Sequence, residues 1–539
     1  MKLRLSLLTI TLLMCSVALW SDEHHEHFNA KEKLGTVSFP TSCAPAVQKP
    51  FERGVALLHS FWYDEAQHQF AEVASKDPNC AMAYWGESMS LWHELWSRPT
   101  PADLKQGWEW MEKAQTLKPK TPRESDYIDA LSAFYRDSSK VDHEKRADAY
   151  SAAMQKVYER YPEDHEAAAF YALSLLASGP EEDLNLTNQR KAIAVLNKLF
   201  AAEPDHPGVT HYLIHACDNP HLADQGLAAA RRYASVAPSS AHALHMPSHI
   251  FARLGLWQED INSNLASIAA SKGQTGMANA HQLHPMDFLE YAYLQIGENS
   301  KAKALVDDVA KMEQPGHAGH MGMEMSMYYN YARAHFPALY LLETRQWKEA
   351  LALPVAPELD ASDRAITYWA HAVAAGHLRD AAAANKAVEQ YDDMVEETKK
   401  GEHSYFADGM KTGSDEARAW LAFAQGKNDE ALALMRPVAD KQDVLGKGEV
   451  ELPAREMLAD MLLEMNRPQE ALVEYEKGLK TDPNRFNGLF GAGRAAELAK
   501  QPEKARTYYT QLIKNCGAST ERPELTKVRT ELASVVRSQ

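Results

Sequence analysis

Histidines with a repeating spacing are the residues of this sequence best placed to do chemistry, and they gather between positions 204 and 293. His211 and His215 are four residues apart, so on a helix both imidazoles share one face. His245 and His249 repeat this spacing 34 residues later. Imidazoles together with a carboxylate suit zinc, copper, iron or nickel, so the pattern predicts a transition-metal site. The predicted ligands are His211, His215, His242, His245, His249, His284 and Asp287.

The interval of 34 residues also appears in features that have no part in metal binding. A small residue is followed twelve positions later by a proline at 66–78, 192–204, 226–238 and 471–483. Most of the chain after Phe51 has helical periodicity, and strand-like alternation is almost absent. This pattern resembles the tetratricopeptide repeat, a stacked helix–turn–helix unit. The resemblance implies an all-α fold, a right-handed superhelical solenoid of helical hairpins. The run HALHMPSHIFARLGLW is similar to a segment of uncharacterised exported bacterial proteins of this family.

In the family that this sequence resembles, the first helices of successive hairpins line a concave groove. The resemblance places the predicted ligands on that wall, where packed helices lie about 8–10 Å apart and can share one ion. Tyr212 or Tyr291 would then donate a hydrogen bond to bound oxygen, and Trp85 would line the aromatic side of the groove. Copper or iron would allow oxidative chemistry and zinc would favour hydrolysis, so whether the site is catalytic stays open. The alternative is a metal-free scaffold that binds a peptide or protein partner along the groove.

The order of segments predicts an exported protein. Lys2 and Arg4 precede a short apolar run, as in a secretory signal, which implies a periplasmic or secreted location. The expected segments are a signal peptide (1–18), an extended histidine-containing leader (19–50), an N-terminal array with the histidine-lined groove (51–310), a loop rich in methionine and histidine (311–327), a C-terminal array (328–519) and a capping helix (520–539).

Two further sets of histidines are secondary candidates. His59 and His93 are 34 residues apart near several tryptophans, and they either close a pocket or pack against those rings. His317 and His320 lie among four methionines, a combination that suits copper(I), although a loop leading to a helix at Tyr328 is the favoured explanation.

Charge and cysteine content narrow the remaining function classes. The net charge of −17 disfavours nucleic acid as a partner, and no segment after the signal is apolar enough to cross a membrane. An oxidising compartment permits disulfides, and Cys43 with Cys80 is the favoured pair because both flank the first hairpin. The sequence contains no phosphate-binding loop, dinucleotide fingerprint, G-x-S-x-G or H-E-x-x-H motif.

Overall fold

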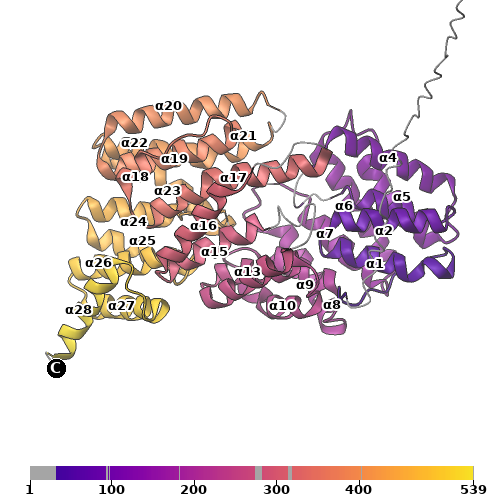
Figure 1. Ribbon diagram of the computed structural model, residues 1–539, viewed down its shortest axis with the longest axis horizontal. Helices are drawn as coiled ribbons and strands as arrows, with labels where there is room; N and C mark the ends of the chain where they lie inside the picture. Colours follow the sequence, from indigo (N-terminus) through magenta and orange to yellow (C-terminus); the bar gives the residue numbers. More distant parts are fainter. Residues whose placement is uncertain are drawn as a thin grey trace, which may run out of the picture.

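The computed structural model describes residues 32–92, 95, 98–180, 182–272, 282–313, 319–401, 404–448 and 450–537. The predicted signal peptide and the first part of the leader lie outside these ranges. Within them all regular structure is helical and no strand occurs, which confirms the predicted all-α solenoid of helical hairpins (Figure 1). No described helix has the length and hydrophobicity needed to span a bilayer.

Consecutive helices pack against each other along the whole chain. The N-terminal half contains η1 (Pro45–Val47), α1 (Gln48–His59), α2 (Tyr63–Lys76), α3 (Ala81–Met89), α4 (Pro101–Thr116), α5 (Pro122–Tyr135), α6 (His143–Arg160), α7 (His165–Leu176), α8 (Thr187–Ala202), α9 (Pro207–Cys217), α10 (Ala223–Val236), α11 (Ala241–His245), α12 (Pro247–Arg253), α13 (Trp257–Ser271), α15 (Leu283–Gln295) and α16 (Asn299–Lys311). The C-terminal half contains α17 (Gly319–Glu343), α18 (Trp347–Leu351), α19 (Ala361–Leu378), α20 (Ala381–Thr398), α21 (Phe406–Gly409), α22 (Lys411–Ala424), α23 (Asn428–Leu445), α24 (Ala454–Glu464), α25 (Pro468–Thr481), α26 (Phe486–Leu498), α27 (Pro502–Cys516) and α28 (Pro523–Arg537).

The prolines and small residues of the repeat pattern have the structural roles that the sequence predicted. Helices α2, α8, α10 and α25 each end two residues before the expected proline, whose ring fixes φ and removes a backbone donor. The small residue early in these helices lets the preceding helix approach closely. At Gly226, for example, a Cβ would lie 2.7 Å from the Cβ of Cys217. These local signals therefore set the hairpin boundaries.

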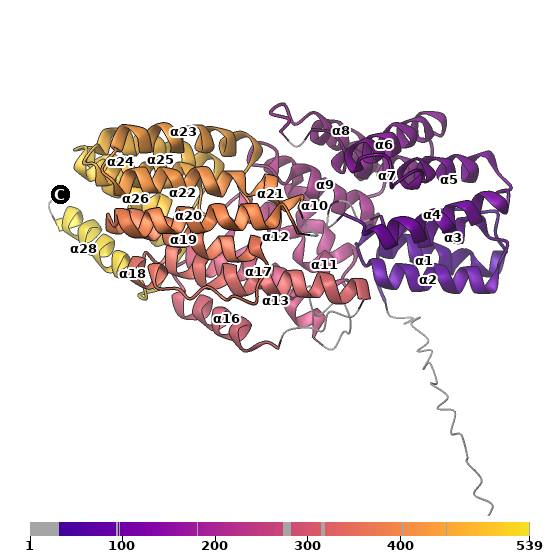
Figure 2. The same ribbon diagram turned by 90° about the horizontal axis from the view of Figure 1, so that it is seen from above.

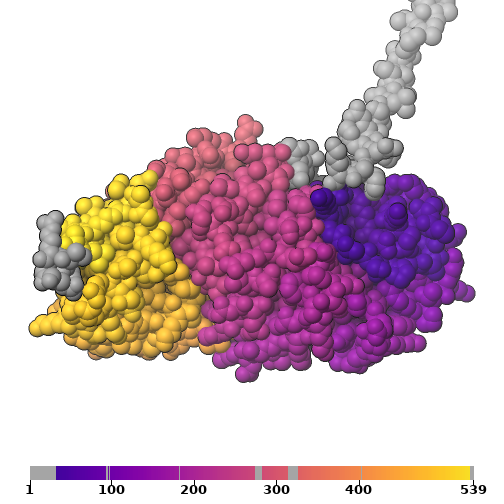
Figure 3. Space-filling view, turned by 90° about the horizontal axis from the view of Figure 1, so that it is seen from below, coloured from indigo at the N-terminus to yellow at the C-terminus, as the bar shows by residue number. Residues whose placement is uncertain are grey.

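The C-terminal half folds back onto the middle of the chain. Asn219 donates a hydrogen bond to the carbonyl of Val444 (2.9 Å), and Trp257 donates one to Asn484 (2.8 Å). Gly255 adopts a φ of +63°, and a Cβ there would collide with the carbonyl oxygen of Pro483. Figures 2 and 3 show the result, with the yellow C-terminal hairpins directly against the magenta middle of the chain in the space-filling view. The histidine-bearing hairpins are therefore covered by helices far away in sequence.

The structure departs from the segment expected as a loop rich in methionine and histidine. Residues 319–327, expected in a loop, form the first turns of α17, since methionine and glutamate are good helix formers. The described part of the leader before η1 contains no helix, and its Phe39 is fully buried against Phe51 and Tyr127. At the other end α28 covers α27 through buried Leu525 and Val528, as a capping helix does.

Candidate metal centre

Six of the seven predicted ligands meet at one place in the structure. They come from the first helices of three consecutive hairpins: α9 carries two, the pair α11 and α12 carries three, and α15 carries one. Pro247 begins α12 directly after α11, with only Met246 between them, so the histidines of both helices remain on one side. The six rings are arranged as two groups of three, not as the single shell that the sequence predicted.

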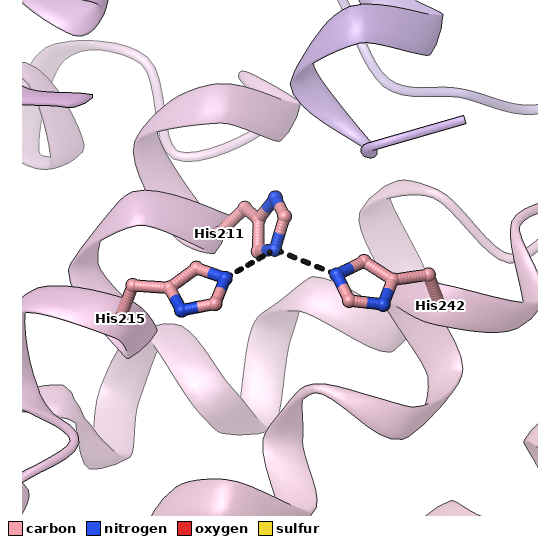
Figure 4. Close-up of side chains that lie close together, drawn as sticks. All are labelled: His211, His215 and His242. Atoms are coloured by element: carbon pink, nitrogen blue, oxygen red, sulfur yellow. Dashed lines mark hydrogen bonds between the residues drawn. The ribbon is translucent and has the colours of Figure 1, made fainter. Parts of the chain in front are cut away.

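The first triad is His211, His215 and His242 (Figure 4). The Nε2 atom of His211 lies 3.1 Å from Nε2 of His215 and 3.0 Å from Nε2 of His242. His211 is fully buried, while His215 is half-buried. The ring of Phe61 packs on all three imidazoles, with centroid distances of 4.3, 5.4 and 5.6 Å.

Hydrogen bonding fixes where His211 carries its proton. Its Nδ1 lies 2.7 Å from the carbonyl oxygen of His59, which only accepts, so Nδ1 carries the hydrogen. Burial lowers the pKa of His211 well below its ordinary value, so the ring is neutral and Nε2 presents a lone pair. Two other imidazoles converge on that single lone pair. The three nitrogens are close enough together to act as ligands of one cation.

The second triad is His245, His249 and His284. The Nε2 atoms of His245 and His249 are 3.0 Å apart, and the ring centroid of His284 lies 4.6 Å from that of His245 and 5.5 Å from that of His249. Phe288 packs on all three rings at 5.0, 4.7 and 5.3 Å.

Both Nδ1 atoms of the pair in α11 and α12 are held by acceptors. His245 donates from Nδ1 to the side-chain oxygen of Asn264 (2.6 Å), whose amide nitrogen is in turn held by Asp260. His249 donates from Nδ1 to Asp218 (2.9 Å). Although burial opposes it, Arg253 and His249 lower the pKa of Asp218, so this carboxyl is ionised. In the neutral form of both rings two lone pairs therefore face each other at 3.0 Å, and either a metal ion or a proton between them would remove their repulsion.

These contacts match the usual surroundings of metal-bound histidines, whose second nitrogen donates to a carboxylate, an amide or a backbone carbonyl. The sequence interpretation missed Asp218, Asn264 and Asp260. Asp218 lies three residues after His215, a signal that could have been noticed. Asn264 and Asp260 are on α13, and nothing in the sequence connects them to His245 because helix packing brings them there.

A cavity of about 1080 Å³ adjoins the second triad. His284 and Asp287 lie on its wall, opposite residues of the C-terminal half. Its aromatic lining consists of Tyr328, Tyr331, Phe336, Trp369, Tyr391 and Phe406. Burial raises the pKa of two lining carboxyls, Asp363 to about 7 and Glu416 to about 8. The cavity wall therefore combines an aromatic lining with two carboxyls that burial makes harder to ionise.

Asp287 is not in either triad, which corrects its predicted role as a ligand. It accepts a hydrogen bond from Nδ1 of His335 on α17 at 3.1 Å. Despite burial, Asp287 raises the pKa of His335, so the two form an ion pair on the cavity wall. The reason is helix packing. Helix α17 lies against α15 and brings His335 to Asp287.

Three predicted groove residues are also engaged elsewhere. The Tyr212 hydroxyl donates to Nδ1 of His59 at 2.8 Å, and the Tyr291 hydroxyl contacts Arg485. Trp85 is buried in the N-terminal core between Tyr127 and Phe170. Both tyrosine hydroxyls are therefore engaged, one by His59 at the end of α1 and the other by Arg485, which directly precedes α26.

His59 belongs to a third buried group, with Glu166 and His206. Each imidazole donates to one oxygen of Glu166, at 2.7 Å from His59 and 3.1 Å from His206. Although burial acts against it, the two imidazoles lower the pKa of Glu166, and Nδ1 of His206 accepts from the Val209 backbone. Every ring nitrogen of this group has a hydrogen-bond partner, so the group is not a set of metal ligands. It supports His211 through the carbonyl oxygen of His59. His59 stacks on Phe170 rather than on a tryptophan, and His93 lies outside the described residues.

The remaining candidates are the two cysteines and the two histidines of the methionine-rich segment. Cys43 and Cys80 are joined by a disulfide, so their sulfurs are not available beside Asp77 as metal ligands. His317 lies outside the described residues. His320 is in the first turn of α17, where only the backbone is described.

Comparison with known proteins identifies the repeat. Residues 456–520 match the family model described as tetratricopeptide repeat. None of the curated proteins compared with the sequence matches it. Among solved structures, the human IFIT1 dimer with PPP-AAAA is 11% identical, covers 81% of this chain and 91% of its own, and has a TM-score of 0.34. The crystal structure of the P58(IPK) TPR domain is 12% identical, with 91% and 99% covered and a TM-score of 0.20. At these TM-scores the likeness carries no inference about what this chain binds.

Proposed function

We propose that this chain, a tetratricopeptide-repeat protein, uses its helical scaffold to bind first-row transition-metal ions, one on each histidine triad. The observation that carries the proposal is the pair of Nε2 atoms of His245 and His249. They face each other at 3.0 Å while both Nδ1 atoms donate to fixed acceptors. A metal ion at about 2.0–2.1 Å from each nitrogen would remove the repulsion and recruit His284 as the third ligand.

The ligand type narrows the choice of metal. Each triad offers three imidazoles and no thiolate or carboxylate, which suits copper, zinc or iron and disfavours magnesium, calcium and manganese. Three protein ligands leave a further coordination position for an exchangeable group, the arrangement of catalytic sites rather than of closed structural ones. The cavity beside His284 supports access of a small molecule to that position.

Export is part of the proposal. The charged and apolar start of the sequence favours a periplasmic or secreted location, and the disulfide between Cys43 and Cys80 is compatible with an oxidising compartment.

A second candidate function is a metal-free scaffold for a peptide or protein partner, which repeat solenoids commonly provide. The large cavity with six aromatic side chains favours it, since such a surface can hold an extended apolar segment. In that function a proton would replace the metal between His245 and His249.

Elemental analysis separates the two functions. The mature protein, purified without a histidine tag and reconstituted with copper, zinc or iron, is compared with the His245→Ala/His249→Ala double variant. We expect about two equivalents of one metal per chain in the wild type and about one in the variant. The matched control is His165→Ala, which removes a half-exposed histidine that is bonded to Glu203 and belongs to neither triad. Absence of metal from the reconstituted wild type would refute the metal proposal and leave the scaffold.

A further inference from the structure

We infer that the two triads form one dinuclear centre, in which the two metal ions share a bridging oxygen ligand from water. The inference rests on the proposed metal binding and adds that the two ions act on each other.

The two triads lie close together. Within the triads, His211 lies 4.7 Å from His215 and 4.9 Å from His242 between ring centroids, and the three centroid distances of the second triad are 4.6–5.5 Å. Between the triads, His215 lies 6.3 Å from His249, and His242 lies 6.3 Å from His245. The gap between the triads is thus only slightly larger than the gaps inside them. Because rings of the two triads are direct neighbours, we place the two ions near the roughly 3.5–4 Å separation typical of two-metal sites.

Two phenylalanines each cover one side of a triad. Phe61 packs on all three rings of the first triad, and Phe288 packs on all three rings of the second. A phenyl ring supplies no ligand, so each triad is closed on the side where its phenylalanine lies. The sides turned toward the other triad are free of these phenyl rings and can take a shared ligand. One water-derived oxygen between them would complete both coordination shells.

The two triads also share helices and repeat positions. His242 and His245 are three residues apart on the short helix α11, and each belongs to a different triad. His215 and His249 are equivalent residues of adjacent repeats and also belong to different triads. The spacing between the two ions is therefore set by one helix and one repeat step, which makes it rigid.

The centre has an entrance on one side. Among the six histidines, His284 is the one on the cavity wall, and it is half-buried. A small ligand that enters from the cavity meets the second ion first and can reach the bridging position from there.

Electron paramagnetic resonance of the copper-loaded protein tests this inference. The probe is Cu²⁺ alone, added to the full mature chain until two equivalents are bound. We expect coupling between the two ions, visible as a spin integral well below two per chain or as a half-field transition. His242→Ala and His284→Ala each remove one triad and should bind about one equivalent with a full, uncoupled spin. His165→Ala should behave as the wild type.

The outcomes separate the inference from the function on which it rests. Two bound equivalents with two full spins and no half-field transition would overturn the dinuclear centre and leave the two separate metal sites standing. Failure to bind copper at all would overturn both. If a single-triad variant does not fold, the wild-type spin integral still decides.

Discussion

The two histidine triads have nearly the same ligand geometry but different supports. In the first, His211 donates to a backbone carbonyl, that of His59, and the support beneath it is the buried group around Glu166. In the second, His249 donates to the carboxylate of Asp218, and His284 borders the cavity. A carboxylate makes its histidine a stronger ligand than a carbonyl does. The repeat thus places the rings of both triads in equivalent positions. The neighbouring helices determine how strongly each ring binds a metal ion and which molecules can reach it.

Glu166→Gln should produce the largest effect and should act on the first triad. Glutamine cannot accept from both imidazoles, so one buried N–H loses its partner, at a cost of about 3 kcal/mol in the free energy of unfolding. His59 would shift and His211 would lose its fixed orientation. Denaturant unfolding measures the stability, and metal titration in the His284→Ala background measures the first triad alone. Unchanged stability and affinity would show that the group around Glu166 does not support the triad.

Asp218→Asn should weaken the second triad by about 10–100-fold in metal affinity, the usual effect of losing a carboxylate behind a ligand. Competition with a chelator in the His242→Ala background isolates this triad. The control is Asp205→Asn, which alters an exposed carboxylate bonded to Arg232. Equal affinities of the two triads in the wild type, or no effect of Asp218→Asn, would contradict the proposed difference between them.

The smallest expected effect concerns the cavity, which adjoins the second triad. Burial raises the pKa of Glu416 to about 8, above its value in the unfolded chain. Between about pH 4.5 and 8 the folded state then binds more protons than the unfolded state, so stability falls as pH rises. Glu416→Gln should make the stability of the metal-free protein less dependent on pH in this range. A slope identical to that of the wild type in urea unfolding between pH 5 and 8 would contradict this.

Much of the fold could be predicted from the sequence because its signals are local. Prolines such as Pro204 and Pro238 stop helices wherever they occur, and small residues such as Gly226 report close helix contacts. The histidines come together because of the same 34-residue repeat. Residues at equivalent positions of successive repeats lie side by side on stacked helices. Residues 319–327 were misjudged because a polar, methionine-rich segment is compatible with both a loop and a helix.

The sequence by itself determined that this chain forms helical hairpins and that six histidines share one wall. Only the tertiary structure decided how those histidines are divided, because His242 and His245 are neighbours on one helix yet point to different partners. It also decided that Asp287 pairs with His335, and that Asp218 and Asn264 hold the second triad. The physical reason is that such contacts depend on how helices rotate and pack, and on the return of the C-terminal half over the middle of the chain, none of which leaves a periodic mark in the sequence.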